Sequence, residues 1–157
     1  MLPLLFLGSC DDDDDITPEP VVVNTKVFDL GSVSDPDISG TATFSELDNG
    51  DVQIDLDVEN TPANGMHPAH IHMNTAAESG AIVLTLGTVD GSTGESSVTV
   101  NAFNDGTAVT YEQLLNYDGY INVHLSSDEL GTLLAQGDIG ENDLTGTSKS
   151  YELDSGD

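Results

Sequence analysis

The chain has 157 residues, enough for one domain with a hydrophobic core, and its 29 acidic side chains against two lysines give a net charge of −27. This charge excludes binding to nucleic acid and to anionic lipid surfaces, because almost nothing in the chain can neutralise phosphate. It favours divalent cations, a saline exterior or basic partners. The single cysteine, Cys10, leaves the domain without an internal disulfide.

The N-terminal end predicts export and a lipid anchor. An apolar run over residues 2–7 leads into Leu7-Gly8-Ser9-Cys10. This motif resembles a lipobox, in which small residues precede the cysteine that receives diacylglycerol. We therefore expect residues 1–9 to be a lipoprotein signal peptide, although its usual basic start is absent, and Cys10 to be lipidated. The alternative is a buried N-terminal strand with a free thiol.

An acidic run, Asp11–Asp15, follows the cysteine directly. Adjacent like charges cannot pack, so residues 10–24 are predicted to form an acidic linker. A cysteine followed by acidic residues resembles the surface-export signal of Bacteroidetes lipoproteins. The resemblance implies an outer-membrane lipoprotein on the cell surface of a Gram-negative bacterium. A plain spacer in the periplasm is the alternative.

The rest of the chain shows the pattern of an all-β domain. Along residues 51–58 apolar side chains occupy every even position and polar ones every odd position, which is typical of a strand with one buried face. Further strands are expected at residues 26–30, 40–44, 81–86, 96–100 and 120–125. Asn49-Gly50 and Asp90-Gly91 are turn signals. Several short strands separated by turns predict an antiparallel sandwich or barrel.

Two short helices are expected near the C-terminal end. Thr110-x-x-Gln113 is a capping box that predicts a helix over residues 111–116. Ser126-x-x-Glu129 has the same form and predicts a second helix to about residue 136, with Gly137 ending it and Gly131 interrupting it.

A faint internal repeat links the two ends of this region. Residues 148–153 resemble residues 25–30, and both lysines, Lys26 and Lys149, occur at the same position of the repeat. Residues 148–157 are therefore either the final strand of the single domain or the first strand of a truncated second copy.

All four histidines lie in two short segments, residues 65–72 and 120–124. If both segments are strands with their aliphatic residues in the core, His70, His72 and His124 all face outward. Three converging imidazoles are a plausible first set of ligands for copper or zinc. His67, before a proline and outside this register, is expected to be structural and to fix a turn. The alternative is that all of these histidines only hydrogen-bond loop carbonyls.

The histidine segments are similar to a CHRD domain, the module first described in chordin. The resemblance rests on Pro68-Ala69-His70-Ile71-His72 and the later Asn122-Val123-His124, and it covers roughly residues 25–147. It implies an extracellular β-sandwich module, often repeated in tandem, without an established catalytic activity.

The spacing Gly-x-His-x-x-His-x-His over residues 65–72 also resembles the copper-ligand strand of copper/zinc superoxide dismutase. That resemblance implies an antiparallel Greek-key β-sandwich, copper ligands at His70, His72 and His124, and a structural role for His67. A bridging histidine, the zinc-ligand loop and a guiding arginine are all absent. We therefore expect that the protein has no dismutase activity and is not an enzyme.

Two functions remain open at this stage. The first is a lipid-anchored, surface-exposed module, non-catalytic, which binds an extracellular protein or glycan or has a structural task. The second is a copper- or zinc-binding protein that uses the three histidines. Calcium binding by acidic loops at residues 35–37 and 141–143 is a weaker alternative, because no ligand loop of defined spacing is present.

Overall fold

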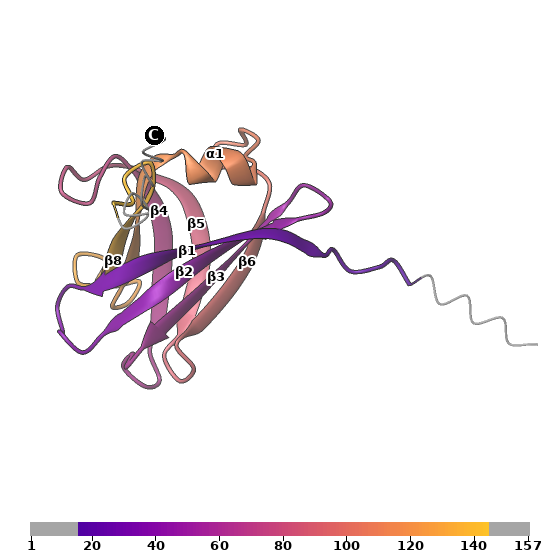
Figure 1. The fold of residues 1–157 in the computed structure, drawn as a ribbon. Helices are drawn as coiled ribbons and strands as arrows, with labels where there is room; N and C mark the ends of the chain where they lie inside the picture. Colours follow the sequence, from indigo (N-terminus) through magenta and orange to yellow (C-terminus); the bar gives the residue numbers. More distant parts are fainter. Residues whose placement is uncertain (1–15, 145–157) are drawn as a thin grey trace, which may run out of the picture.

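The computed structural model describes residues 16–144, which form eight strands and one short helix (Figure 1). The strands are β1 (Val22–Ser32), β2 (Ser39–Leu47), β3 (Val52–Glu59), β4 (Met66–Met73), β5 (Ile82–Asp90), β6 (Glu95–Val100), β7 (Asp118–His124) and β8 (Leu133–Gly140). The helix is α1 (Tyr111–Leu115). Cys10, the acidic run Asp11–Asp15 and the segment 148–157 lie outside the described residues.

All pairings between these strands are antiparallel, in the order β5-β4-β7-β8-β1-β2-β3-β6. The two end strands, β5 and β6, also contact each other, so the sheet nearly closes into a barrel. β4, β5 and β6 are successive neighbours and β7 returns beside β4, which is a Greek-key connection. The expected all-β antiparallel, sandwich-like fold is confirmed.

The barrel has two halves, and the strand pairing between β1 and β8 that joins them is short. β1 pairs with β2 along most of its length, but it pairs with β8 only at Gly31 and Ser32. One half therefore contains β1, β2, β3 and β6, and the other contains β5, β4, β7 and β8. Each of the six strands that the sequence predicted coincides with a strand of the structure, within a few residues at the ends.

The predicted helix over residues 126–136 is wrong. Ser126 and Glu129 form only a turn, in which the Glu129 N–H donates to the Ser126 carbonyl at 3.2 Å. The following residues form β8, which pairs with both β7 and β1. Gly131 weakens a helix here, and the buried Leu134 and Ala135 gain more by completing the sheet. A Cβ at Gly137 would overlap the Asp29 carbonyl, so this glycine permits the close approach of β8 to β1.

The capping box at the first predicted helix is confirmed. The Thr110 side chain accepts from the Gln113 N–H at 3.3 Å, and the Gln113 side chain accepts from the Thr110 N–H at 2.9 Å. The helix contributes Tyr111 and Leu114 to the core. It lies across one open end of the barrel (Figure 1).

The core is formed by the alternate residues that the strands turn inward. Phe28 and Phe44 pack edge to face with ring centroids 5.0 Å apart, a favourable arrangement for aromatic pairs. Ala69 and Ile71 from β4 face Ile121 and other aliphatic residues of the same cluster. The opposite parity of β4 and β7 therefore points away from the core.

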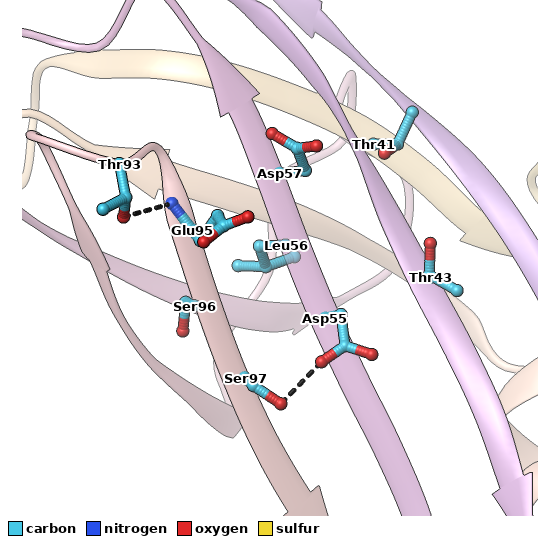
Figure 2. A pocket seen from close by; sticks show the side chains of 9 residues that line it. All are labelled: Thr41, Thr43, Asp55, Leu56, Asp57, Thr93, Glu95, Ser96 and Ser97. Atoms are coloured by element: carbon cyan, nitrogen blue, oxygen red, sulfur yellow. Dashed lines mark hydrogen bonds between the residues drawn. The ribbon is translucent and has the colours of Figure 1, made fainter. Parts of the chain in front are cut away.

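The outer face of β2, β3 and β6 is polar (Figure 2). It carries hydroxyl groups and carboxylates that alternate with the buried core residues, and the Ser97 hydroxyl donates to Asp55 across the β3–β6 pair. This face forms a shallow hollow lined by Thr41, Thr43, Asp57 and Glu95 among others. Within residues 16–144, no helix has the length and apolar character that a membrane crossing requires.

Candidate metal centre

Two neighbouring strands, β4 and β7, bring three histidines together. β4 and β7 pair in regular antiparallel register, with His70 opposite Asn122 and His72 opposite Tyr120. His124 follows two residues along the same face of β7. Because side chains alternate along a strand, all of these residues lie on the face opposite Ile71 and Ile121. The three histidines therefore share the strand face that the alternation in the sequence predicted.

His70, His72 and His124 each place one ring nitrogen within 4.8 Å of the others. The ring centroids are 5.2 Å apart for His70 and His124, and 6.1 and 6.2 Å apart for the pairs that include His72. A shared ion with metal–nitrogen bonds of 2.0–2.1 Å would need nitrogens about 3.4–3.6 Å apart. The three rings are thus close together but slightly farther apart than a bound ion would require, so binding would draw the ligand atoms closer.

Two of the three imidazoles are anchored through their Nδ1 atoms. The His124 Nδ1–H donates to the Leu130 carbonyl at 2.7 Å, and the His72 Nδ1–H donates to the Gly80 carbonyl at 2.9 Å. An imidazole that donates from Nδ1 presents the lone pair of Nε2 when it is neutral. Metal-binding histidines are typically oriented by such a bond to a carbonyl.

The group of three histidines contains two buried ring nitrogens that have no hydrogen-bond partner. His124 Nε2 and His70 Nδ1 are both inaccessible to solvent and make no hydrogen bond in the structure. Buried polar atoms are nearly always satisfied, so two unsatisfied nitrogens in one group of neighbouring rings need an explanation. A bound cation would satisfy both lone pairs at once.

Tyr120 and Gly80 fix the position of His72. The Tyr120 ring stacks on the His72 ring, with centroids 4.9 Å apart and planes 16° apart. Its hydroxyl accepts from the Gly80 N–H at 3.1 Å, while the Gly80 carbonyl accepts from His72. A Cβ at Gly80 would overlap the Met73 carbonyl, so the loop can approach β4 this closely only with glycine here.

Asn122 lies between the strands beside His72. Its Oδ1 accepts from Gln136 Nε2 at 2.7 Å, which turns its amide nitrogen toward His72 Nε2 at 3.5 Å. Asn122, Gln136 and Tyr120 were not among the site residues predicted from the sequence. Their parity was the available signal, since Tyr120 and Asn122 share the face of His124.

Burial shifts the titration of two of these histidines. Desolvation lowers the pKa of His70, and the charges of His124 and His72 lower it further. Desolvation also lowers the pKa of His124, partly opposed by the hydrogen bond to Leu130, and the charge of His72 adds to the lowering. Both rings are therefore held in the neutral form, which is the form that binds metal.

The histidines are less exposed than the sequence suggested. His72 and His124 retain only 9% and 5% of their accessible surface, and His70 is half-buried. They face away from the core, but the loops 74–81 and 125–132 fold over them. The Asp138 carboxylate holds the first loop by accepting from the Ala76 N–H at 2.8 Å. Strand alternation alone could not reveal this cover, because it depends on loop conformation.

His67 lies on the other parity of β4 and is fully buried. Its Nδ1–H donates to the Leu125 carbonyl at 2.7 Å, and its Nε2 lies 3.4 Å from the Pro62 carbonyl. A Cβ at Gly65 would overlap the ring. His67 thus ties the loop before β4 to the residue after β7, and the structure does not place it among the three clustered histidines.

The group of possible ligands contains only imidazoles among residues 16–144. Carboxylates of the acidic loops considered for calcium make contacts with other protein groups. The Asp35 carboxylate accepts from the Asp37 N–H at 3.0 Å, and Asp143 forms an ion pair with Lys26 at 2.9 Å. The hollow on the outer face of β2, β3 and β6 belongs to the other half of the barrel.

Comparison with known proteins supports one family. The sequence model of the CHRD domain matches residues 26–133, which include all four histidines, the strands β2 to β7 and the larger part of β1. No curated protein and no solved structure matches the chain. Since the match spans more than half of the sequence, the chain belongs to the CHRD domain family.

Proposed function

We propose that this CHRD domain is a non-catalytic module that binds one copper or zinc ion through His70, His72 and His124. The observation that carries the proposal is the pair of buried, unpartnered nitrogens, His70 Nδ1 and His124 Nε2, in a group of three imidazoles. The carbonyl anchors of His72 and His124 support it, because each occupies Nδ1 and leaves Nε2 with the lone pair that can bind metal.

Copper is the ion that the ligands favour. Imidazole suits both copper and zinc, but at a given nitrogen site divalent copper binds more tightly than zinc. Three protein ligands leave at least one coordination position for water or another small ligand. The net charge of −27 raises the local concentration of any divalent cation around the domain.

Metal titration of the full chain carrying Cys10→Ser tests the proposal, since a free thiol would itself bind copper. Competition with a chromogenic chelator should show one tight Cu²⁺ site per chain and a weaker Zn²⁺ site. Copper spectra should show nitrogen ligands. If this protein and a variant without the three histidines bind Cu²⁺ equally weakly, the proposed metal site is wrong.

The matched control is the triple variant His70→Gln, His72→Gln and His124→Gln in the same background. It retains all 29 acidic residues, so any copper held by carboxylates remains in the control. Far-ultraviolet circular dichroism and the thermal midpoint of the metal-free proteins establish that the variant is folded.

We further propose that the module is tethered at the cell surface through lipid on Cys10. The support is the sequence Leu7-Gly8-Ser9-Cys10 and the acidic run after it. Residues 16–21, which lead into β1, belong to no helix or strand, as expected of a spacer.

Metabolic labelling with a fatty acid in a Gram-negative host tests the lipid, and Cys10→Ser is the control. Protease treatment of intact cells tests exposure on the surface. Labelling that persists in Cys10→Ser would contradict the anchor, and a chain protected until the outer membrane is opened would contradict surface display.

A further inference from the structure

The three imidazoles of the centre are not held equally. His72 and His124 each donate a hydrogen bond to a loop carbonyl, and both are almost completely buried. His70 is half-buried, and within residues 16–144 neither of its ring nitrogens has a hydrogen-bond partner. Its Nδ1 is buried, so the part of His70 that solvent reaches lies away from this nitrogen.

This asymmetry decides which ligand can move. Rotation of the His72 or His124 ring would break a hydrogen bond of 2.9 or 2.7 Å and leave a carbonyl of the covering loop without its donor. Rotation of the His70 ring breaks no hydrogen bond. The same freedom lets the His70 ring adjust its position relative to the other two ligand atoms, which all lie within 4.8 Å of one another.

We propose that His70 is the exchangeable ligand of the three-His centre, and that its position accepts a neutral nitrogen donor such as the imidazole of a partner's histidine. The inference rests on the metal binding proposed above. The exchange breaks one metal–nitrogen bond, to His70, and forms one to the incoming imidazole. The oxidation state of the ion does not change, and no proton transfer is needed when both imidazoles are neutral.

The class of incoming ligand follows from the charge of the domain. With a net charge of −27, the surface repels anions such as azide or carboxylates. A neutral imidazole experiences no such repulsion and is a preferred ligand of copper. The centre would therefore receive or release copper by ligand exchange with a histidine-bearing partner.

Rescue of ligand-deleted variants by imidazole tests the proposal in the full chain carrying Cys10→Ser. His70→Gly should bind Cu²⁺ at least about 10-fold more weakly than the parent protein. Added imidazole should restore the affinity to within about threefold, because the cavity opens to solvent. With ¹⁵N-labelled imidazole, the copper resonance should show coupling to the label.

His124→Gly is the matched control. It removes the same ring from a neighbouring strand, but it also frees the Leu130 carbonyl and leaves a cavity that solvent does not reach. Imidazole should not restore its affinity. Equal rescue of both variants, or of neither, overturns the assignment of His70. Absence of copper binding by the parent protein overturns the proposed function instead.

Release kinetics of the parent protein provide a test that needs no substitution in the site. The rate at which bound copper passes to a chelator should rise with imidazole concentration and should not respond to azide. A rate that is independent of imidazole would overturn the proposal, whatever the folding of the glycine variants.

Discussion

The ring of Tyr120 stacks on the ring of His72, and its hydroxyl accepts a hydrogen bond from the Gly80 N–H at 3.1 Å. One residue thus supports a candidate ligand in two ways, by contact with its face and by holding the loop carbonyl that orients it.

Tyr120→Phe separates these two contributions. The ring stacking remains, but the Gly80 N–H loses its acceptor, so we expect a loss of about 1 kcal/mol in the free energy of unfolding. Copper affinity should fall about 10-fold, because the orientation of His72 is less fixed. Chelator competition and chemical denaturation measure the two effects. Tyr117→Phe, a change at a half-buried tyrosine that packs on Phe103, is the control and should leave affinity unchanged.

Metal binding should protect the two covering loops from hydrogen exchange. His72 and His124 are bonded to Gly80 and Leu130, so fixing both rings on one ion also fixes residues 74–81 and 125–132. Exchange measured with and without Cu²⁺ should slow in these loops and stay constant in β2 and β3. Protection spread evenly over the barrel would contradict this coupling.

The stability of the metal-free protein should fall as the pH drops below the ordinary histidine pKa. The pKa values of His70 and His124 are lowered in the fold from 6.5. The unfolded chain therefore binds protons first, and stability decreases from pH 6.5 downward until the folded-state pKa values are passed. Thermal midpoints of the parent and of His70→Gln with His124→Gln, compared between about pH 5 and 7.5, isolate the effect. The difference in thermal midpoint between the parent and the variant should shift in favour of the variant as the pH falls.

His67→Gln should destabilise the fold more than it affects the metal. The buried ring loses its bond to the Leu125 carbonyl, which we expect to cost about 1–3 kcal/mol in the free energy of unfolding. One Cu²⁺ should still bind per chain. Complete loss of copper from a folded His67→Gln protein would show that His67 belongs to the ligand set.

Phe44→Ala tests the part of the core that lies between β1 and β2. Phe44 is fully buried and packs on Phe28, so the substitution should cost about 3–5 kcal/mol in the free energy of unfolding. Denaturant titration measures this loss. Val27 is exposed on the outer face of β1. Its substitution should therefore change the free energy of unfolding by less than about 0.5 kcal/mol.

The sequence predicted the elements that depend on local patterns. Alternation in residues 51–58 and the Thr110 capping box correspond directly to β3 and α1. The helix predicted over residues 126–136 was wrong because long-range strand pairing outweighed the local capping-box pattern. β8 forms through pairing with residues such as Ser32 and Val123, which are too distant in the sequence for a local pattern to include.

The candidate site divides in the same way. Parity in β4 and β7 was sufficient to group His70, His72 and His124 on one face. The anchors at Gly80 and Leu130 were not predictable, because backbone carbonyls carry no signal in the sequence. Burial of the rings followed from those anchors and was missed with them.

The place of β1 in the barrel bears on how the domain would withstand force. β1 is the strand nearest the proposed tether, and antiparallel hydrogen bonds run across the strand direction. A pull along β1 from its N-terminal end would load the bonds to β2 together, in shear, rather than open them one after another. β1 pairs with β8, in the half that holds the histidines, only at Gly31 and Ser32, so most of such a load would fall on the β1–β2 ladder rather than on the strands that carry the candidate ligands.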